Sequence, residues 1–170
     1  LSSVRAGNVI GGGDWSNNRL IPDCIRSLSK NKKIFLRNPN FNRPWQLVLE
    51  PLKGYLVLAK KQFEEPLKFS GAWNFGTETK NAVSVRKIVE LIINFWGKGK
   101  VELFEKSKFH EQQNLQIDST KAKKFLKWKT TYNTKKAVEV TTEWYSKILR
   151  SKKSAEDVTN QQIKEYMKYS

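Results

Sequence analysis

Cysteine and histidine are nearly absent from this chain, which has one of each, Cys24 and His110, in 170 residues. A single cysteine excludes an internal disulfide and fits a reducing compartment. One His and one Cys without paired ligand spacing argue against zinc, so we predict no metal site. The residue types permit a Cys24–His110 nucleophilic pair, but Cys24 falls on the apolar face of a predicted helix, which favours an inert core thiol. His110 with Glu111 leaves open a general acid–base pair or, more commonly, a solvated loop histidine.

Long apolar runs and a leader sequence are also lacking. No run approaches the roughly 18 residues that span a bilayer, and the first residues carry neither a charged leader nor an apolar core. We therefore expect a cytoplasmic protein with no membrane partner. The first residue is not Met, and strand-like sequence already begins at Val4, so we expect the chain to be cut at its N-terminus.

The familiar phosphate-binding glycine motifs are missing as well. Gly11 and Gly13 would need a glycine at position 16 to complete the dinucleotide-binding fingerprint, and that residue is Ser16. No Gly-Lys-Ser/Thr follows, which excludes a P-loop, and no nucleophile-elbow motif is present. The run Gly11–Gly13 is predicted to be a turn after a strand, with backbone that a ligand can approach closely. We assign no catalytic residue, because no catalytic constellation is complete.

Acidic residues are few, with 16 Asp and Glu against 32 Lys and Arg and a net charge of +16. Such a charge fits a nucleic-acid binder, whose affinity falls with salt. However, the lysines are spread along the chain, with no block of five or six like charges and no aromatic-plus-basic RNA motif. Solvated basic faces explain the excess better, and nucleic-acid binding is a less favoured alternative.

Apolar residues, in contrast, are sufficient for a core: 38% are hydrophobic and 12% aromatic, too many for a disordered chain. Strand-like segments alternate with helical ones, which predicts an α/β fold with a small mixed sheet. The predicted strands are residues 4–10, 34–36, 72–76 and 101–104, and the predicted helices are residues 20–28, 51–63, 85–96 and 134–149, with a short helix after 118.

Two further structural predictions follow from the pattern of apolar residues. The helix at 51–63 is predicted to turn these residues inward: Leu52, Tyr55, Leu56, Ala59 and Phe63. Residues 1–150 are predicted to form the domain, and residues 151–170 a polar basic tail containing at most a weak helix.

The stretch 5–51 brings glycines, amides, arginines and tryptophans together. An Arg guanidinium forks onto phosphate oxygens, and an Asn donates and accepts at one edge. This composition suits a polar, anionic, partly aromatic ligand such as a nucleotide sugar. A plain loop–strand–loop segment with solvated arginines is an equally favoured interpretation of composition alone.

The motifs of this stretch resemble a known family. They are residues 5–15 (RAGNVIGGGDW), 19–23 (RLIPD), 36–39 (LRNP), 43–46 (RPWQ) and 48–51 (VLEP), followed in order by 71–76 (GAWNFG), 110–111 (HE) and 144–145 (WY). Together they resemble the CDP-glucose 4,6-dehydratase family, a branch of the extended short-chain dehydrogenases that modify nucleotide sugars. The resemblance covers residues 1 to about 150.

The resemblance implies a homo-oligomeric enzyme of two parts, an N-terminal NAD-binding Rossmann domain and a C-terminal nucleotide-sugar domain. The family oxidises the sugar at C4 with NAD, eliminates water across C5 and C6 and returns the hydride to C6, which serves deoxysugar synthesis for surface polymers such as lipopolysaccharide O-antigen. The family's glycine fingerprint, Tyr-x-x-x-Lys pair and Thr-Asp-Lys segment belong before residue 1. The chain therefore resembles the C-terminal, substrate-binding part, which we expect to be inactive alone.

The same resemblance assigns site residues. It places Asn8 beside the sugar diphosphate, with Arg19 and Arg43 as its basic partners. The backbone of Ala6 and Gly7 falls near the nicotinamide end of NAD. The remaining assignments are a base-binding strand and two further pocket positions: Ile34, Leu36 and Arg37, then Asn74 and His110. The chain departs from the family pattern at Leu47, where His is usual, and at Thr77, where Pro is usual, and these departures bear on fine substrate choice.

Two other classes stay open at this point. The chain fits another nucleotide-sugar dehydratase or epimerase, which affinity for CDP-, UDP- and dTDP-sugars would distinguish. It also fits a non-catalytic remnant or split product, which the coding sequence upstream of Leu1 would reveal.

Overall fold

The computed structural model of the chain describes residues 1–36, 38–77, 82–103 and 117–170. Its helices are α1 (Leu20–Ser29), α2 (Leu49–Glu64), α3 (Val85–Trp96), α4 (Thr120–Leu126), α5 (Thr134–Leu149) and α6 (Ala155–Met167). Its strands are β1 (Ser2–Ala6), β2 (Val9–Ile10), β3 (Ile34–Leu36), β4 (Asn42–Arg43), β5 (Gln46–Leu47), β6 (Gly71–Phe75), β7 (Val83–Ser84) and β8 (Val101–Leu103). Helices and short strands alternate as predicted, and the fold is mixed α/β.

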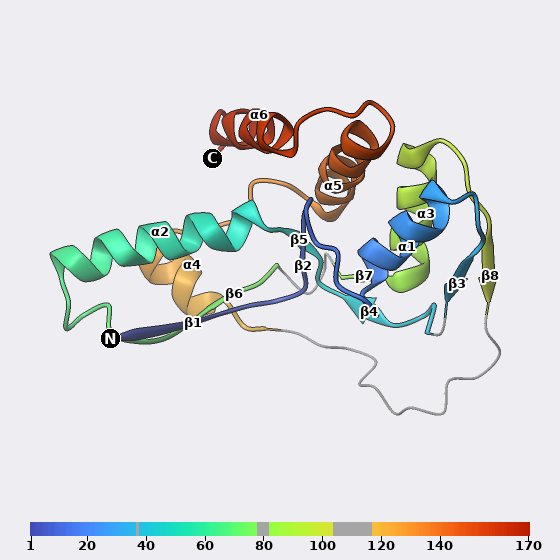
Figure 1. The fold of residues 1–170 in the computed structure, drawn as a ribbon. Coiled ribbons are helices and arrows are strands. Elements are labelled where there is room, and N and C mark those ends of the chain that lie inside the picture. Colours follow the sequence, from blue (N-terminus) through green and yellow to red (C-terminus); the bar gives the residue numbers. More distant parts are fainter. Residues whose placement is uncertain (37, 78–81, 104–116) are drawn as a thin grey trace.

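The strands of the described part pair two by two. The pairs β1–β6, β2–β5 and β3–β8 are parallel, and β4–β7 is antiparallel. Figure 1 shows β1 and β6 beneath α2 and α4 on one side of the molecule, with β3 and β8 beside α1 and α3 on the other. The buried apolar residues accordingly form a larger cluster under α1, α3, α5 and α6 and a smaller one around Trp73 and Phe75.

The single strand predicted for residues 4–10 is wrong, because the chain changes sheets at Gly7 and Asn8. The amide of Gly7 donates to the carbonyl of Phe75 at 3.1 Å, which ends the pairing of β1 with β6. The carbonyl of Asn8 then accepts from the amide of Gln46 at 2.9 Å, which starts the pairing of β2 with β5. Each half of the predicted strand therefore satisfies its backbone on a different partner.

Local signals place helix α3 well. The Ser84 hydroxyl accepts from the amide of Lys87, and Gly97 ends the helix with φ of 90°. A Ser cap and a left-handed glycine are the preferred residues at these two positions. Its predicted apolar face is buried at Ile88, Val89, Ile92 and Trp96, which packs α3 against α5.

The predicted inward face of α2 is wrong at four of its five residues; only Tyr55 packs against the smaller apolar cluster. Leu56 is 74% and Phe63 91% exposed, and Leu52 and Ala59 are exposed too. The buried positions are instead Glu50, Pro51, Gly54 and Leu58. Gly54 lies against the ring of Phe75, where a Cβ would overlap the ring. The absence of a side chain at Gly54 lets this face of the helix approach β6 closely.

The segment after residue 150 includes helix α6, which packs on the core. Val158 and Tyr166 are buried, whereas Met167 is exposed. Trp144 of α5 donates to Thr159 at 2.9 Å, and Gln162 donates to the carbonyl of Val140 at 2.8 Å. The predicted terminal helix is therefore present and docked, while the division of the chain at residue 150 stays a prediction.

Candidate functional site

The predicted cofactor and diphosphate residues meet where β1 ends. Ala6, Gly7 and Asn8 are half-buried at the carboxyl ends of the parallel strands β1 and β6. In open α/β sheets ligands bind outside the carboxyl ends of the strands. Asn74 lies on β6 opposite Arg5, and its side chain donates to the carbonyl of Asp118 at 3.2 Å. The fold thus brings four of the predicted site residues to one corner.

The glycine run after β2 is explained by packing and turning. A Cβ on Gly11 would lie 2.8 Å from Cγ1 of Val48, and one on Gly12 would overlap the indole of Trp144. Gly13 has φ of +84°, a conformation that side chains rarely adopt. Packing at Gly11 and Gly12 and the backbone conformation at Gly13 already explain why these residues are glycines. The prediction that this run presents backbone to a ligand stays untested.

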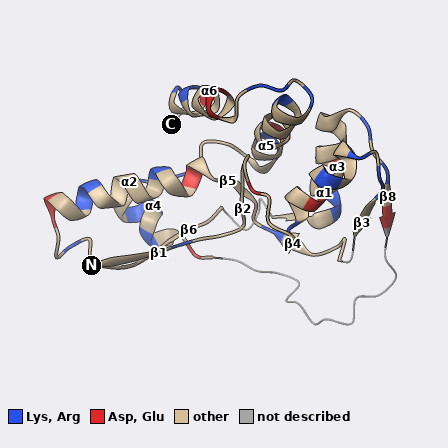
Figure 2. Cartoon of the chain, viewed as in Figure 1, with Lys and Arg blue, Asp and Glu red and all other residues tan. Residues whose placement is uncertain are grey.

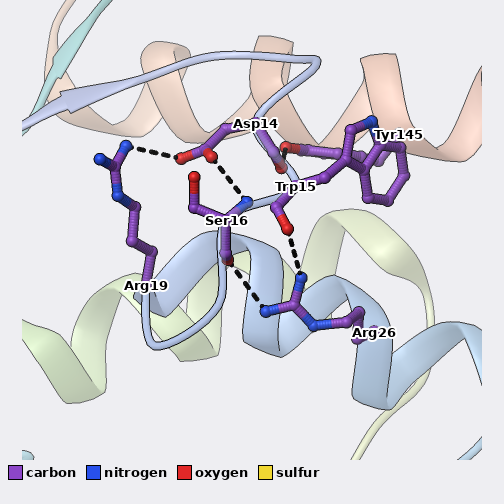
Figure 3. A network of polar contacts seen from close by, with 6 residues as sticks. All are labelled: Asp14, Trp15, Ser16, Arg19, Arg26 and Tyr145. Carbon is purple, nitrogen blue, oxygen red and sulfur yellow. Dashed lines mark hydrogen bonds and ion pairs between the residues drawn. The ribbon is translucent and has the colours of Figure 1, made fainter.

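Polar contacts hold the loop that follows, as Figure 3 shows. The Asp14 carboxylate accepts from the amide of Ser16 at 3.0 Å and pairs with Arg19 at 3.2 Å. The hydroxyl of Tyr145 donates to the carbonyl of Asp14 at 2.5 Å. Partial burial opposes ionisation of Asp14, but the hydrogen bonds from Ser16 and Arg19 outweigh it and lower the pKa of the carboxyl. The ion pair with Asp14 therefore holds the Arg19 side chain against the loop, at the start of α1.

Arg26 of α1 holds the same loop from below. Its guanidinium donates to the carbonyls of Trp15 and Ser16, each at 3.0 Å, and pairs with Asp23. A planar fork suits two neighbouring carbonyls. Sequence reasoning missed both Arg26 and Tyr145 as positioning groups. For Tyr145 the sequence offered one signal, the family resemblance at residues 144–145, but that resemblance assigned no role to the Tyr145 side chain. For Arg26 it offered none.

Arg19 and Arg43 differ in setting. The side chain of Arg19 is 67% exposed and paired to Asp14 at the start of α1. Arg43 lies on β4, donates to the carbonyl of Asn42 at 3.0 Å and stacks 5.3 Å from the ring of Phe41. Its strand pairs with β7, whereas Asn8 lies between β1 and β2, which pair with β6 and β5. Both arginines retain the chemistry that anion binding needs.

The predicted base-binding strand is β3, whose predicted residues point into the core. Ile34 is 3% and Leu36 2% exposed, and both belong to the larger apolar cluster. Any contact that they make with a base must therefore come from their backbone. Arg37 and His110 lie outside the residues that the structure describes.

Cys24 is fully buried, and burial raises the pKa of its thiol to about 12. A nucleophilic cysteine needs a thiolate near neutral pH, so this thiol is inert. Within the described ranges, no three His, Cys, Asp or Glu side chains gather as a metal site requires. A hollow of about 300 Å³ between α5 and α6 is lined by none of the predicted site residues.

Figure 2 shows Lys and Arg on every helix rather than on one element. Several are paired one helical turn away, as Lys61 is with Glu64 and Lys147 with Glu143. This distribution matches solvated faces better than a tract that follows a nucleic-acid backbone. No helix in the described part of the chain is long and apolar enough to cross a membrane.

Comparison with known proteins adds direct evidence. No protein-family model matches the chain. The sequence is 40% identical to CDP-glucose 4,6-dehydratase of Salmonella typhimurium across 98% of this chain and 46% of that protein. The chain therefore spans about half the length of the curated relative that it matches. The two are homologous over the C-terminal half of the enzyme, which confirms the resemblance read from the motifs.

Solved structures agree on the fold. A dTDP-glucose 4,6-dehydratase from Bacillus anthracis in complex with NAD has a TM-score of 0.70 at 22% identity, covering 86% of this chain and 44% of that one. An epimerase from Methanothermobacter thermautotrophicus reaches 0.73 at 17% identity, covering 87% and 44%. A UDP-glucuronic acid 4-epimerase from Bacillus cereus reaches 0.70 at 16% identity, covering 85% and 45%. These likenesses confirm the predicted α/β fold, which the chain shares with part of each of these enzymes.

Proposed function

We propose that this chain, a homologue of CDP-glucose 4,6-dehydratase over about half of that enzyme's length, is the sugar-nucleotide-binding portion of an NAD-dependent enzyme with that activity. The observation that carries the proposal is 40% identity across 98% of the chain. In such an enzyme bound NAD would supply reversible hydride transfer, and the overall reaction would convert CDP-glucose to CDP-4-keto-6-deoxyglucose and water. The proposal includes a cytoplasmic location, which the single buried cysteine supports.

The residues of the chain divide the binding of such a ligand among them. Asn8 can donate to and accept from the sugar diphosphate at the end of β1. Arg19 and Arg43 supply the positive charge for its phosphate oxygens. The backbone of Ala6 and Gly7 would lie along the nicotinamide. Asn74 completes the corner, and the backbone of β3 would line the base.

Two features of this chain suit contact with the NAD-binding half of such an enzyme, an open strand edge and an exposed apolar stripe. In the part of the chain that the structure describes, β1 has a strand neighbour, β6, on one side only, so its other edge is open. Parallel sheets in proteins are normally covered on both faces and extend over more strands. Leu52, Leu56 and Phe63 form an exposed apolar stripe on α2, the helix that lies above β1 and β6 in Figure 1. We assign this edge and stripe to the NAD-binding half, which the chain's coverage of its relative leaves out.

Calorimetric titration of the chain with CDP-glucose and UDP-glucose at moderate salt tests the function. We expect CDP-glucose to bind more tightly, and Arg43→Ala to weaken it about ten- to hundredfold, because charge-assisted hydrogen bonds contribute about 1.5–3 kcal/mol. Lys60→Ala, which removes an equal charge from the exposed side of α2, should change little.

Equal affinity for both nucleotides would favour another nucleotide-sugar dehydratase or epimerase. An unchanged affinity in Arg43→Ala would overturn the diphosphate assignment. Sequencing the DNA before the codon of Leu1 separates the remaining class. A glycine fingerprint and Tyr-x-x-x-Lys in frame support a two-part enzyme, and a start codon at that point supports a remnant or split product.

A further inference from the structure

Gln46 is a polar side chain buried in an apolar setting. It is 0% exposed, and its neighbours Trp45 and Leu47 belong to the larger apolar cluster. Burying an amide is unfavourable unless it is hydrogen-bonded. The Oε1 atom of Gln46 is buried with no hydrogen-bond partner among the described residues. An apolar side chain of similar size would avoid that penalty, so the amide calls for an explanation.

The contacts of Gln46 converge on the corner where the chain changes sheets. Its Nε2 donates to the carbonyl of Phe75 at 2.8 Å. The amide of Gly7 donates to that same carbonyl at 3.1 Å. The backbone amide of Gln46 donates to the carbonyl of Asn8 at 2.9 Å. One residue on β5 thus holds the end of β6 with its side chain and Asn8 with its backbone.

The side chain of Gln46 also lies within van der Waals reach of Gly7. A Cβ on Gly7 would lie 3.7 Å from Nε2 of Gln46, so the amide runs directly beside this residue. The sheets β1–β6 and β2–β5 share no strand in the described structure. The Gln46 amide is therefore a polar link between them at the Gly7–Asn8 step.

We propose that Gln46 is a positioning residue that links the two sheets through the carbonyl of Phe75 and so fixes Gly7 for the nicotinamide and Asn8 for the sugar diphosphate. This role rests on the proposed function. It goes further than that function because Gln46 would touch no ligand itself. Its task would be to hold Gly7 and Asn8, which would touch the ligands. On this proposal the cost of burying Oε1 without a hydrogen bond is accepted because Nε2 of the same amide fixes the carbonyl of Phe75.

The first experiment needs no ligand. Amide hydrogen exchange in the free chain, followed by NMR, should be about fivefold faster for Gly7 in Gln46→Met, because loss of one net hydrogen bond weakens the local structure by roughly 1 kcal/mol. Gln162→Met is the matched control, since its Nε2 also donates to a carbonyl at 2.8 Å, that of Val140. It should leave Gly7 unchanged.

A conservative variant guards against a folding defect. In Gln46→Glu, a protonated carboxyl can still donate to the carbonyl of Phe75, whereas a carboxylate cannot. Gly7 should therefore be better protected at pH 5 than at pH 8 in this variant, beyond the change seen in the wild-type chain. Equal Gly7 protection in the wild type and Gln46→Met would overturn the proposal.

The second experiment measures CDP-glucose affinity by calorimetry. Gln46→Met should weaken binding about tenfold while Gln162→Met does not, since a structural loss alone would affect both. Equal weakening in the two variants contradicts positioning. If the wild-type chain binds no CDP-glucose, the proposed function fails in this form of the protein, while the exchange of Gly7 still decides whether Gln46 holds the corner.

Discussion

Single side chains hold the loops of this protein by donating to backbone carbonyls. Arg26 holds Trp15 and Ser16, and Tyr145 holds Asp14. A loop with several glycines has much conformational freedom to lose on folding. A few well-placed donors therefore decide whether Arg19 and the rest of the loop have a fixed geometry.

Tyr145 gives a pH-dependent test at this scale. Burial raises the pKa of its hydroxyl from 10.0 to about 12. A folded-state pKa above the unfolded value means that the neutral hydroxyl contributes stability fully below pH 10 and loses it as the pH rises through 12. Tyr145→Phe should lower the unfolding free energy by about 1 kcal/mol at pH 8.

The difference between the wild type and Tyr145→Phe should shrink between pH 10 and pH 11.5, as measured by urea unfolding. Titration of the lysines is common to both proteins and cancels in the comparison. A difference that stays constant over this range would contradict the assigned role of burial.

At the scale of elements, a buried carboxylate joins three segments. Glu50, in the first turn of α2, is 0% exposed. It accepts from the amides of Thr131 and Tyr132, each at 2.8 Å, and from the hydroxyl of Tyr166 at 2.7 Å. A carboxylate near a helix N-terminus is also favoured by the helix dipole. Helix α6 is thereby tied to the start of α2, although the two are far apart in sequence.

Tyr166→Phe removes one donor from that buried carboxylate. The expected loss of unfolding free energy is about 1–3 kcal/mol, because a buried charged acceptor is left less satisfied. Urea unfolding at neutral pH measures it. Tyr169→Phe is the control, because Tyr169 lies just beyond the end of α6 and is 66% exposed. Equal effects of the two substitutions would mean that the Glu50 contact contributes nothing specific.

At the scale of the whole molecule, the exposed stripe on α2 and the open edge of β1 leave one side incompletely covered. Exposed apolar patches and unpaired edges commonly mark interaction surfaces and promote association. The positive net charge opposes association of like chains. The balance between the two should therefore depend on salt.

The double substitution Leu56→Glu with Phe63→Glu should reduce self-association of the isolated chain in sedimentation experiments. It should leave the unfolding free energy nearly unchanged, since both side chains are exposed in the folded chain. Leu149→Glu, at another partly exposed apolar position on α5, should leave association as it is. Equal reduction by both would mean that the stripe is not the associating surface, because each added Glu lowers the positive net charge and on that ground should favour association.

Sequence alone determined the elements whose signals are local, and it pointed to the relative that the chain matches. Helix α3 follows from apolar periodicity, a Ser84 cap and Gly97. The motif order led to the correct relative, because such motifs need no knowledge of packing. The burial of α2 was predicted on the wrong side, since periodicity cannot tell whether an apolar face meets this chain or another part of a larger protein.

Only the tertiary structure decided how distant segments meet. The predicted strand at 4–10 divides at Gly7 because residues 46 and 75 offer it two different partners. Gln46, Arg26 and Tyr145 carried no recognisable signal as positioning groups, since each acts on a carbonyl that is remote in sequence. Hydrogen-bond partners of buried polar groups are set by packing, and packing is a property of the folded chain as a whole.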